Sequence, residues 1–480
     1  MKSSPGAIAA ALSSFLIAVF CGFSKDTATV PDVPIVVTSA PAYDPLAALR
    51  GADRFAKGAQ LLVVRGDRAE LLIPNFAAAA DASVSFDAKT ILFSGKKTAG
   101  DPWQIWELTL ADHAVRQVTA GSADAVRPLY LPGRRLVFAR RSAQGGFQLV
   151  AAGLDGKDEL PLTYMAASAM PTDVLADGRI LFESGFPLGS EKTPELFLVY
   201  SDGSGVESYR CDHGSAQWGG QAGSPATDPG RWGGHQLASG DVVFTHGSAL
   251  ARFTSPLAHE APVAVPRADY AGAIAETSSG AWLVSTRSSS AAPYALKLWK
   301  PSPASSPRAP AAMTTILSRA GENLVDPVLV APRERPKQHP SALHDWNYAN
   351  LLALDARQSR DGALPTAPAQ VRLETLDAKG HTVALGTAPV ESDGSFFVKV
   401  PPDQPLHFVL LDQKGDCLRQ EHGWFWIRRG EQRICVGCHT GPERAAENNV
   451  PAVLLRSTTP TDLTGASAAQ TAQRAEKGSR

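Results

Sequence analysis

The sequence predicts a mainly β protein in which a β-propeller is followed by a small β-sandwich. Short apolar triplets recur along the middle of the chain at a spacing near 40–45 residues, which is typical of propeller blades. Asp-Gly and Ser-Gly pairs, which favour tight turns, separate the apolar runs. Gly and Pro are abundant, with 41 and 36 of the 480 residues. This composition indicates many turns and therefore many short strands.

Charge and cysteine content exclude several classes of protein. The chain has 46 Lys and Arg against 47 Asp and Glu, and its formal net charge of −1 argues against a nucleic-acid binder with a basic surface. A hydrophobic content of 44% argues against global disorder. Five cysteines are too few for a disulfide scaffold, so their positions are more informative than their number.

The N-terminus carries a predicted export signal. Residues 7–20 form an apolar run of 14 residues, which suits the core of a signal peptide and is short for a membrane helix. We therefore predict a signal peptide over residues 1–21 and an N-terminal leader over 22–58. Cys21 resembles a bacterial lipidation site, but the bulky Phe20 departs from that motif, so a plain cleaved signal and an uncleaved anchor remain alternatives. Each alternative places the protein in the periplasm or cell envelope, with no membrane contact beyond the N-terminus.

The propeller prediction depends on the repeated triplets. They lie at residues 91–93, 136–138, 180–182, 242–244 and 282–284. Their ends are 45, 44, 62 and 40 residues apart, and most are followed by a second apolar run. A sixth blade can be assembled from both ends of the region, with residues 60–64 and 70–73 joined by 325–331. We predict six blades over residues 59–336, with five or seven blades, or a β-sandwich with coincidental spacing, as alternatives.

Irregular segments interrupt and follow the repeats. Residues 211–234 are a Gly-rich insertion that contains Cys211, and we interpret it either as a functional loop or as a surface excursion. The Pro-rich residues 302–312 and 331–341 are predicted to be loops that leave the propeller.

Strand patterns resume near residue 349. The expected strands are 351–354, 370–376, 382–385, 395–400 and 407–411. They predict a small antiparallel β-sandwich over residues 337–413. Residues 457–480 are rich in Ser, Thr, Ala and Gln without hydrophobic periodicity, and we predict a disordered tail there.

A C-x-x-C-H motif at Cys435, Cys438 and His439 carries the chemistry of the chain. This pattern is the attachment signature of c-type haem, because two thiols three residues apart reach both vinyl groups of one porphyrin. His439 is then the proximal ligand of the iron. A zinc half-site would need a second Cys/His pair nearby, and a thiol redox pair usually has a βαβ context. We therefore predict one covalent haem c on residues 414–456, which completes the predicted fold as propeller, sandwich and c-type haem-binding segment.

Residues near the motif are candidates for the rest of the haem site. Trp424 and Trp426 could wall a flat apolar macrocycle, with ordinary core packing as the alternative. Arg433, like Arg428 and Arg429, is close enough in sequence to pair with a haem propionate.

The distal side of the iron is not determined by the sequence. His422 is the nearest candidate ligand, and an iron open on that side is the alternative. His407 is also near the motif, and the candidates that would have to arrive by folding are His213, His235, His381, Met165, Met170 and Met313. Cys211 and Cys417 form a disulfide in one interpretation and remain free thiols in the other.

The C-terminal part resembles a known family. The similarity is carried by residues 388–391 (APVE), 393–396 (DGSF), 423–426 (GWFW), 430–433 (GEQR) and 441–443 (GPE), together with the C-x-x-C-H motif. These stretches are similar to bacterial envelope proteins related to the hydrazine synthase alpha subunit. The resemblance implies a TolB-like propeller joined to a C-terminal c-type haem region. That subunit carries several haems and a tyrosine ligand after one motif, whereas residues 440–444 contain no Tyr and one motif is present here, so hydrazine synthesis itself is not expected.

Three functions are consistent with these features. The first is an exported monohaem c-type cytochrome-like protein that transfers single electrons to a redox partner protein. The second is a haem-dependent redox enzyme that acts on a small molecule beneath the propeller channel. The third is a non-catalytic envelope scaffold or binding protein.

Overall fold

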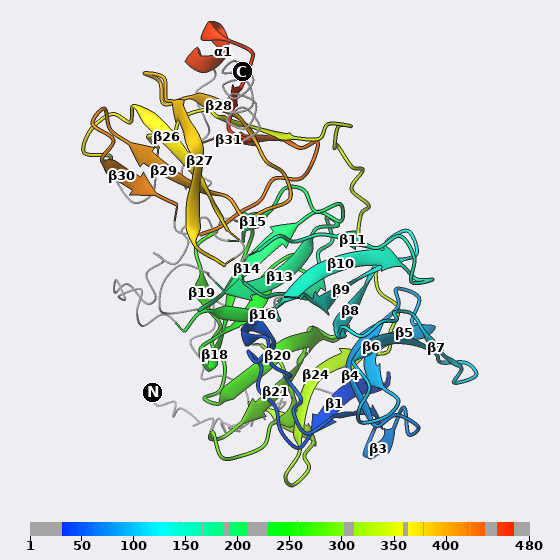
Figure 1. Ribbon diagram of the computed structural model, residues 1–480. Helices are drawn as coiled ribbons and strands as arrows, with labels where there is room; N and C mark the ends of the chain where they lie inside the picture. Colours follow the sequence, from blue (N-terminus) through cyan, green and yellow to red (C-terminus); the bar gives the residue numbers. More distant parts are fainter. Residues whose placement is uncertain are drawn as a thin grey trace, which may run out of the picture.

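A computed structural model describes residues 31–464 except for 144, 166, 186–192, 210–228, 257, 302–311, 359–362, 378, 422 and 437–448. Six four-stranded antiparallel sheets surround a common axis and form a propeller, and two further four-stranded sheets form a sandwich at one side of it (Figure 1). The described helices are short: η1 (Ala48–Arg50) and α1 (Ala452–Arg456). The predicted mainly β fold with six blades is confirmed.

The first blade joins both ends of the propeller sequence. Its strands, from the axis outward, are β24 (Asn323–Leu329), β1 (Ile35–Ala40), β2 (Gln60–Arg65) and β3 (Arg68–Leu71). β24 pairs antiparallel with β1, so the end of the domain closes on its beginning. The predicted leader over 22–58 is therefore wrong as a boundary, because β1 is entirely buried within the blade. The long segment between β1 and β2 separates β1 from the repeat and hid it from the spacing argument.

The other five blades are consecutive in the chain. Their strands are β4 (Ala78–Val84), β5 (Thr90–Lys96), β6 (Gln104–Thr109), β7 (Val115–Gln117); β8 (Ala125–Leu131), β9 (Arg135–Arg141), β10 (Phe147–Gly153), β11 (Leu160–Pro161); β12 (Ala169–Val174), β13 (Ile180–Gly185), β14 (Pro194–Val199), β15 (Glu207–Ser208); β16 (Arg231–Gln236), β17 (Val242–His246), β18 (Ala249–Phe253), β19 (Ala261–Pro262); β20 (Asp269–Glu276), β21 (Trp282–Arg287), β22 (Ala295–Trp299), β23 (Thr314–Leu317). Each apolar triplet lies in the second strand of its blade. That strand is covered on both faces by neighbouring blades, which explains its continuous apolar run.

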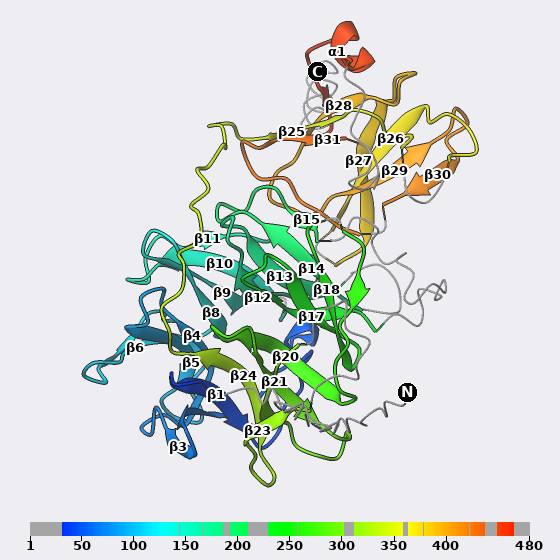
Figure 2. The same ribbon diagram turned by 180° about the vertical axis from the view of Figure 1, so that it is seen from behind.

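The two Pro-rich segments differ in position. Residues 302–312 connect β22 to β23 inside the sixth blade, so the prediction that they leave the propeller is wrong. Residues 331–341 do leave it, and they run along its outside toward the sandwich (Figure 2). Backbone bonds from Arg333 N to Phe86 O and from Lys337 N to Ala176 O, both 3.0 Å, hold this linker against the blades.

The sandwich contains more of the chain than the sequence indicated. One sheet has the order β31 (Gln432–Cys435), β25 (Ala349–Ala353), β28 (Phe396–Val400), β32 (Thr461–Asp462), and the other β27 (Thr382–Pro389), β26 (Gln370–Leu376), β29 (His407–Leu411), β30 (Cys417–Gln420). The predicted boundaries of a separate haem-binding segment at 414–456 and of a disordered tail from 457 are therefore wrong. Both regions supply strands to the sandwich, and Leu463 is buried in its core. These strands are two to four residues long, too short for a periodic pattern.

The sandwich docks on the fourth blade through the turn between β14 and β15. Trp426 Nε1 donates to Gly203 O at 2.9 Å, and Arg428 Nε donates to Asp202 O at 3.1 Å. Gly203 has φ +84°, and a Cβ there would lie 2.9 Å from Arg428 Cδ, so the turn requires glycine. Trp426 is fully buried in the core shared by the third and fourth blades. The two domains are thus joined by continuous apolar packing.

An ion pair joins the fourth and fifth blades. His235 Nδ1 on β16 lies 2.9 Å from Asp173 Oδ2 on β12. Burial alone would lower the pKa of His235, but the charge and hydrogen bond of Asp173 outweigh it and raise that pKa above the usual value. Burial opposes ionisation of Asp173 too, and the same contact lowers its pKa.

We expect replacement of His235 by Gln to remove a pH-dependent part of the stability. A histidine whose pKa is raised in the folded state adds stability that is complete below its unfolded pKa of about 6.5 and is lost as the pH rises through the folded pKa. Urea unfolding should therefore show a stability difference from wild type that shrinks toward alkaline pH. His381→Gln is the control, since its pair with Asp377 is exposed. A difference for His235→Gln that is constant with pH would contradict this account.

Candidate functional site

The predicted haem attachment motif begins at the end of the edge strand β31. This strand pairs in parallel with β25, with Cys435 opposite Ala353, and Leu354 N donates to Cys435 O at 2.8 Å. Cys435 is half-buried against the sandwich core, and burial raises the pKa of its thiol despite the nearby Arg433. The strand thus fixes the first cysteine of the motif on a rigid element. Cys438 and His439 lie outside the described residues.

Arg433 lies on the same face of β31 as Cys435, two residues earlier, and its positive charge opposes the rise in the pKa of the Cys435 thiol. Its Nη2 donates to Val206 O of the propeller. Its Nη1 is buried without a hydrogen-bond partner among the described residues and lies 3.9 Å from Glu431 Oε1. A buried guanidinium with an unused donor beside the attachment cysteine fits a carboxylate such as a haem propionate.

The other two arginines are placed differently. Arg428 is buried, its Nη1 lies 2.6 Å from Asp403 Oδ1, and the same nitrogen contacts Tyr164 Oη. These contacts belong to the domain interface. Arg429 is exposed, and its backbone N bonds Asp403. Of the three arginines, Arg433 is therefore the one that remains as a candidate propionate partner.

The two tryptophans upstream of the motif have separate environments. Trp426 is 0% exposed and occupies the domain interface, which assigns it to core packing and not to a haem wall. Trp424 is buried beside the ring of His407, with ring centroids 5.3 Å apart. Its indole Nε1 has no hydrogen-bond partner among the described residues. Trp424 therefore stays a candidate for the haem environment.

Several candidates for a distal iron ligand are engaged elsewhere. His407 Nε2 lies 2.7 Å from Glu421 O and Nδ1 lies 3.2 Å from Glu374 Oε2, so both ring nitrogens have partners. Met165 and Met170 are buried in blade cores, and Met313 packs against the sixth blade. His422 and His213 lie outside the described residues.

The remaining cysteines are only partly described. Cys417 begins β30 and is exposed with a free thiol. Cys211 and Cys21 lie outside the described residues, so the suggested disulfide and lipidation remain predictions.

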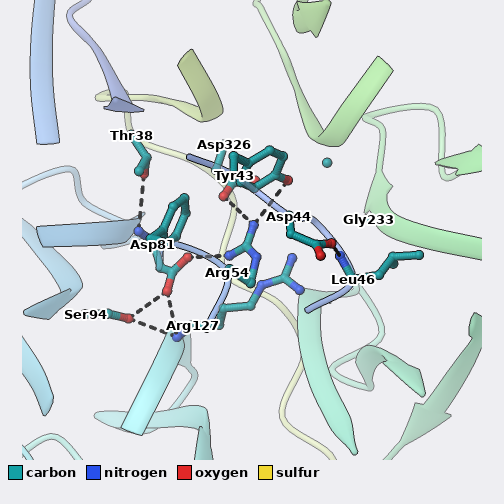
Figure 3. A network of polar contacts seen from close by, with 12 residues as sticks. Thr38, Tyr43, Asp44, Leu46, Arg54, Asp81, Ser94, Arg127, Gly233 and Asp326 are labelled. Carbon is teal, nitrogen blue, oxygen red and sulfur yellow. Dashed lines mark hydrogen bonds and ion pairs between the residues drawn. The ribbon is translucent and has the colours of Figure 1, made fainter. Parts of the chain in front are cut away.

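A charged network on the propeller axis was not apparent from the sequence (Figure 3). Arg54, in the segment between β1 and β2, donates from Nη1 to Asp81 Oδ1 at 2.6 Å and from Nη2 to Asp326 Oδ2 at 2.7 Å. The Arg54 side chain is 5% exposed. Next to it, Arg127 Nη1 bonds Glu183 Oε1 at 2.6 Å. Arg54 comes from the predicted leader, which explains why the repeat pattern gave no reason to place it here.

Irregularities in the innermost strands accompany the polar groups at this axis. Each of the six breaks register with its neighbour through a bulge or similar irregularity. Five of these irregularities hold a residue with a left-handed φ: Asp81, Arg127, Gly233, Gly272 and Asp326. Glu183 Oε2 also accepts from Gly233 N at 2.8 Å, which links the fourth and fifth blades. The network thus couples the segment around Arg54 to most of the ring.

No helix in the described part of the chain is long and apolar enough to cross a membrane.

Comparisons with known proteins give matches to sequence and to structure. Residues 353–440 match the family model of the hydrazine synthase alpha subunit middle domain, a stretch that runs from the end of β25 through the C-x-x-C-H motif. Hydrazine synthase subunit alpha from Kuenenia stuttgartiensis is 38% identical over 72 residues, which is 15% of this chain and 9% of that protein.

The structural matches cover more of the chain. The solved Kuenenia stuttgartiensis hydrazine synthase aligns with a TM-score of 0.73 at 17% identity, over 89% of this chain and 72% of that chain. TolB from Acinetobacter baumannii aligns with a TM-score of 0.39 at 13% identity, over 61% of this chain and 66% of that chain. Residues 353–440 are thus related in sequence to the hydrazine synthase alpha subunit, and the chain shares the fold of the solved hydrazine synthase, which combines a propeller and a sandwich.

Proposed function

We propose that this protein is an exported c-type cytochrome-like protein that carries one covalent haem c on the edge of its β-sandwich and transfers single electrons to a redox partner protein. The observation that carries the proposal is the C-x-x-C-H motif, whose first cysteine ends a paired strand and which lies within the stretch that matches the alpha subunit middle domain. Edge strands end at the surface, where a tethered cofactor can be reached by another protein.

The residues of the chain have separate roles in this proposal. Cys435 and Cys438 form the thioether bonds, and the His439 imidazole binds the iron. Arg433 offers a buried guanidinium to a propionate. The haem supplies the one-electron chemistry, while the protein sets its exposure, its charge environment and its orientation toward the partner.

Apolar side chains next to the motif support an exposed cofactor. Among the described residues, Ile434 and Val436 before the motif are 56% and 48% exposed, and Val450 and Leu455 after it are 61% and 75% exposed. Large apolar side chains this exposed mark surfaces that bind a ligand or another protein when they lie together. Ile434 and Val436 flank Cys435 directly in the chain, so exposed apolar side chains next to the first motif cysteine support a cofactor or a docking partner there.

The charge pairs on the propeller axis favour electron transfer over an enzyme that acts on a small molecule in the propeller channel. The enzyme interpretation needs a small molecule to reach the propeller axis. Arg54, Asp81 and Asp326 are paired on that axis and leave the arginine 5% exposed. These paired charges occupy the axis that a substrate would have to reach.

We expect loss of covalent haem when both motif cysteines are replaced. The wild-type chain, expressed with haem maturation factors, should show a reduced c-type α-band and haem that stays attached under denaturing conditions. The Cys435→Ser/Cys438→Ser variant should lose both signals, since no thioether can form. Cys417→Ser is the matched control because Cys417 is an exposed thiol outside the motif.

Other outcomes separate the competing functions. Absence of covalent haem from the wild-type chain would overturn the proposal and favour the scaffold interpretation. Haem that is present and binds CO rapidly would indicate an open iron and favour a redox enzyme. A six-coordinate iron that does not bind CO supports electron transfer.

A further inference from the structure

The propeller reaches the neighbourhood of the motif through one turn. Residues 202–206, between β14 and β15, supply Gly203 O to Trp426 and Val206 O to Arg433. Their sequence separations are 223 and 227 residues, so these contacts exist only because the domains are docked. Arg433 lies two residues before Cys435 on the same face of β31. A backbone carbonyl of the propeller thus holds a cation beside the attachment cysteine.

The same turn also holds the acidic neighbour of Arg433. Glu431 Oε1 accepts from Gly205 N at 3.2 Å, and its Oε2 accepts from Arg428 N at 2.8 Å. Both carboxylate oxygens are therefore occupied by backbone donors, and Arg433 Nη1 stays 3.9 Å from Glu431 without a hydrogen bond. Phe425 covers the guanidinium at 5.9 Å from its ring centroid. Val206 O, Glu431 and Phe425 thus surround the guanidinium of Arg433, and its Nη1 has no hydrogen-bond partner among the described residues.

Among the described residues, two carboxylates act on Cys435 beside Arg433, and one of them is Glu431. Arg433 is 19% exposed and Glu431 10% exposed in their side chains, so solvent screens them little. Glu421 is the other carboxylate that acts on Cys435. A fixed cation near a haem favours the reduced iron, which carries one positive charge less than the oxidised iron.

We infer that the propeller turn 202–206 positions Arg433 and thereby raises the reduction potential of the haem attached at Cys435. This inference rests on the proposed function, since it needs a haem at the motif. The charge of Arg433 acts on the haem, and the turn affects the reduction potential by holding Arg433 in place. The β-propeller accordingly contributes to the redox properties of the haem through this turn.

The test is a spectroelectrochemical titration of the full-length haem protein and of variants. Arg433→Gln should lower the ratio of reduced to oxidised haem at a fixed potential by about tenfold, which for a one-electron couple corresponds to about 59 mV. Arg433→Lys keeps the charge and should retain most of the wild-type potential. Arg429→Gln is the matched control, because Arg429 is exposed and lies four residues away.

A second comparison tests the part played by the propeller. Trp426→Phe keeps a ring in the interface but removes the bond to Gly203 O, so it should lower the potential in the same direction as Arg433→Gln, by less. In an Arg433→Gln background, Trp426→Phe should have no further effect, because the turn acts through the arginine.

The possible outcomes distinguish failure of the inference from failure of the proposed function. Wild-type protein without covalent haem would overturn the proposed function itself. Haem-loaded Arg433→Gln and Arg429→Gln proteins with equal potentials would overturn the inference and leave the proposed function standing. Equal lowering of the potential by Trp426→Phe with and without Arg433 would contradict the inference that the turn acts through Arg433, and no effect of Trp426→Phe when Arg433 is present would contradict a role for the propeller. Circular dichroism of each variant confirms that the compared proteins are folded.

Discussion

Replacement of Arg54 by Ala is expected to destabilise the protein by roughly 3–5 kcal/mol, because it leaves buried carboxylates without their counter-charge. Arg54 joins Asp81 on β4 to Asp326 on β24, two strands from adjacent blades at the closure of the ring. Burial by itself lowers the pKa of Arg54, but Asp326, Tyr43 and Asp81 outweigh it and raise that pKa. The guanidinium is thus charged, and its loss exposes two acids to mutual repulsion at the axis.

The control for this variant lies in the same segment. Arg50 pairs with Asp44 on the surface, with side chains 55% and 54% exposed, so Arg50→Ala should cost less than about 1 kcal/mol. Urea unfolding of both variants gives the comparison. Equal destabilisation by Arg54→Ala and Arg50→Ala would contradict a stabilising role for the network. Removing the acids together with the base, in Arg54→Met/Asp81→Asn/Asp326→Asn, should recover part of the loss.

Replacement of Trp426 by Ala is expected to separate the two domains energetically. The indole is fully buried between the blades and the sandwich, and truncating a buried Trp costs roughly 3–5 kcal/mol. Gly203 O also loses its donor, which adds about 1 kcal/mol. With the interface weakened, unfolding should change from a common transition to two transitions, one for each domain.

Trp346→Ala is the matched control for Trp426→Ala. Trp346 is half-buried, stacks between His344 and Tyr348 in the linker before β25, and does not belong to the apolar core that Trp426 shares with the blades. It should leave a single transition with a small shift in its midpoint. A Trp426→Ala protein that unfolds in one transition at the wild-type midpoint would show that the domains are joined by other contacts.

Much of the propeller could be predicted because its signals are local. The second strand of each blade is buried on both faces, and it therefore appears as an apolar triplet such as 91–93 in β5 or 136–138 in β9. β1 was missed because the segment around Arg54 interrupts the spacing. β31 and β32 were missed because parallel edge strands of two to four residues carry no periodicity.

The C-x-x-C-H motif could be located in the sequence for a similar reason, whereas its surroundings could not be predicted. The C-x-x-C-H pattern is contained in five consecutive residues, so it needs no tertiary information. Trp424 and Trp426 are equally close to it in sequence, but a two-residue step along the chain places one beside His407 and the other in the blade core. Sequence proximity therefore could not separate a candidate for the haem environment from an interface residue.

The sequence by itself determined the strand-rich class and the blade repeat, and it contained the C-x-x-C-H motif, because each of these signals lies within a few neighbouring residues. Only the tertiary structure decided which distant residues meet. Arg54 and Asp326 are 272 residues apart, Trp426 and Gly203 are 223 apart, and β1 pairs with β24. These contacts depend on how the ring closes and how the sandwich packs on it. Burial of apolar surface drives ring closure and sandwich packing. A local apolar pattern shows that a surface will be buried, but it does not show which distant element will cover it.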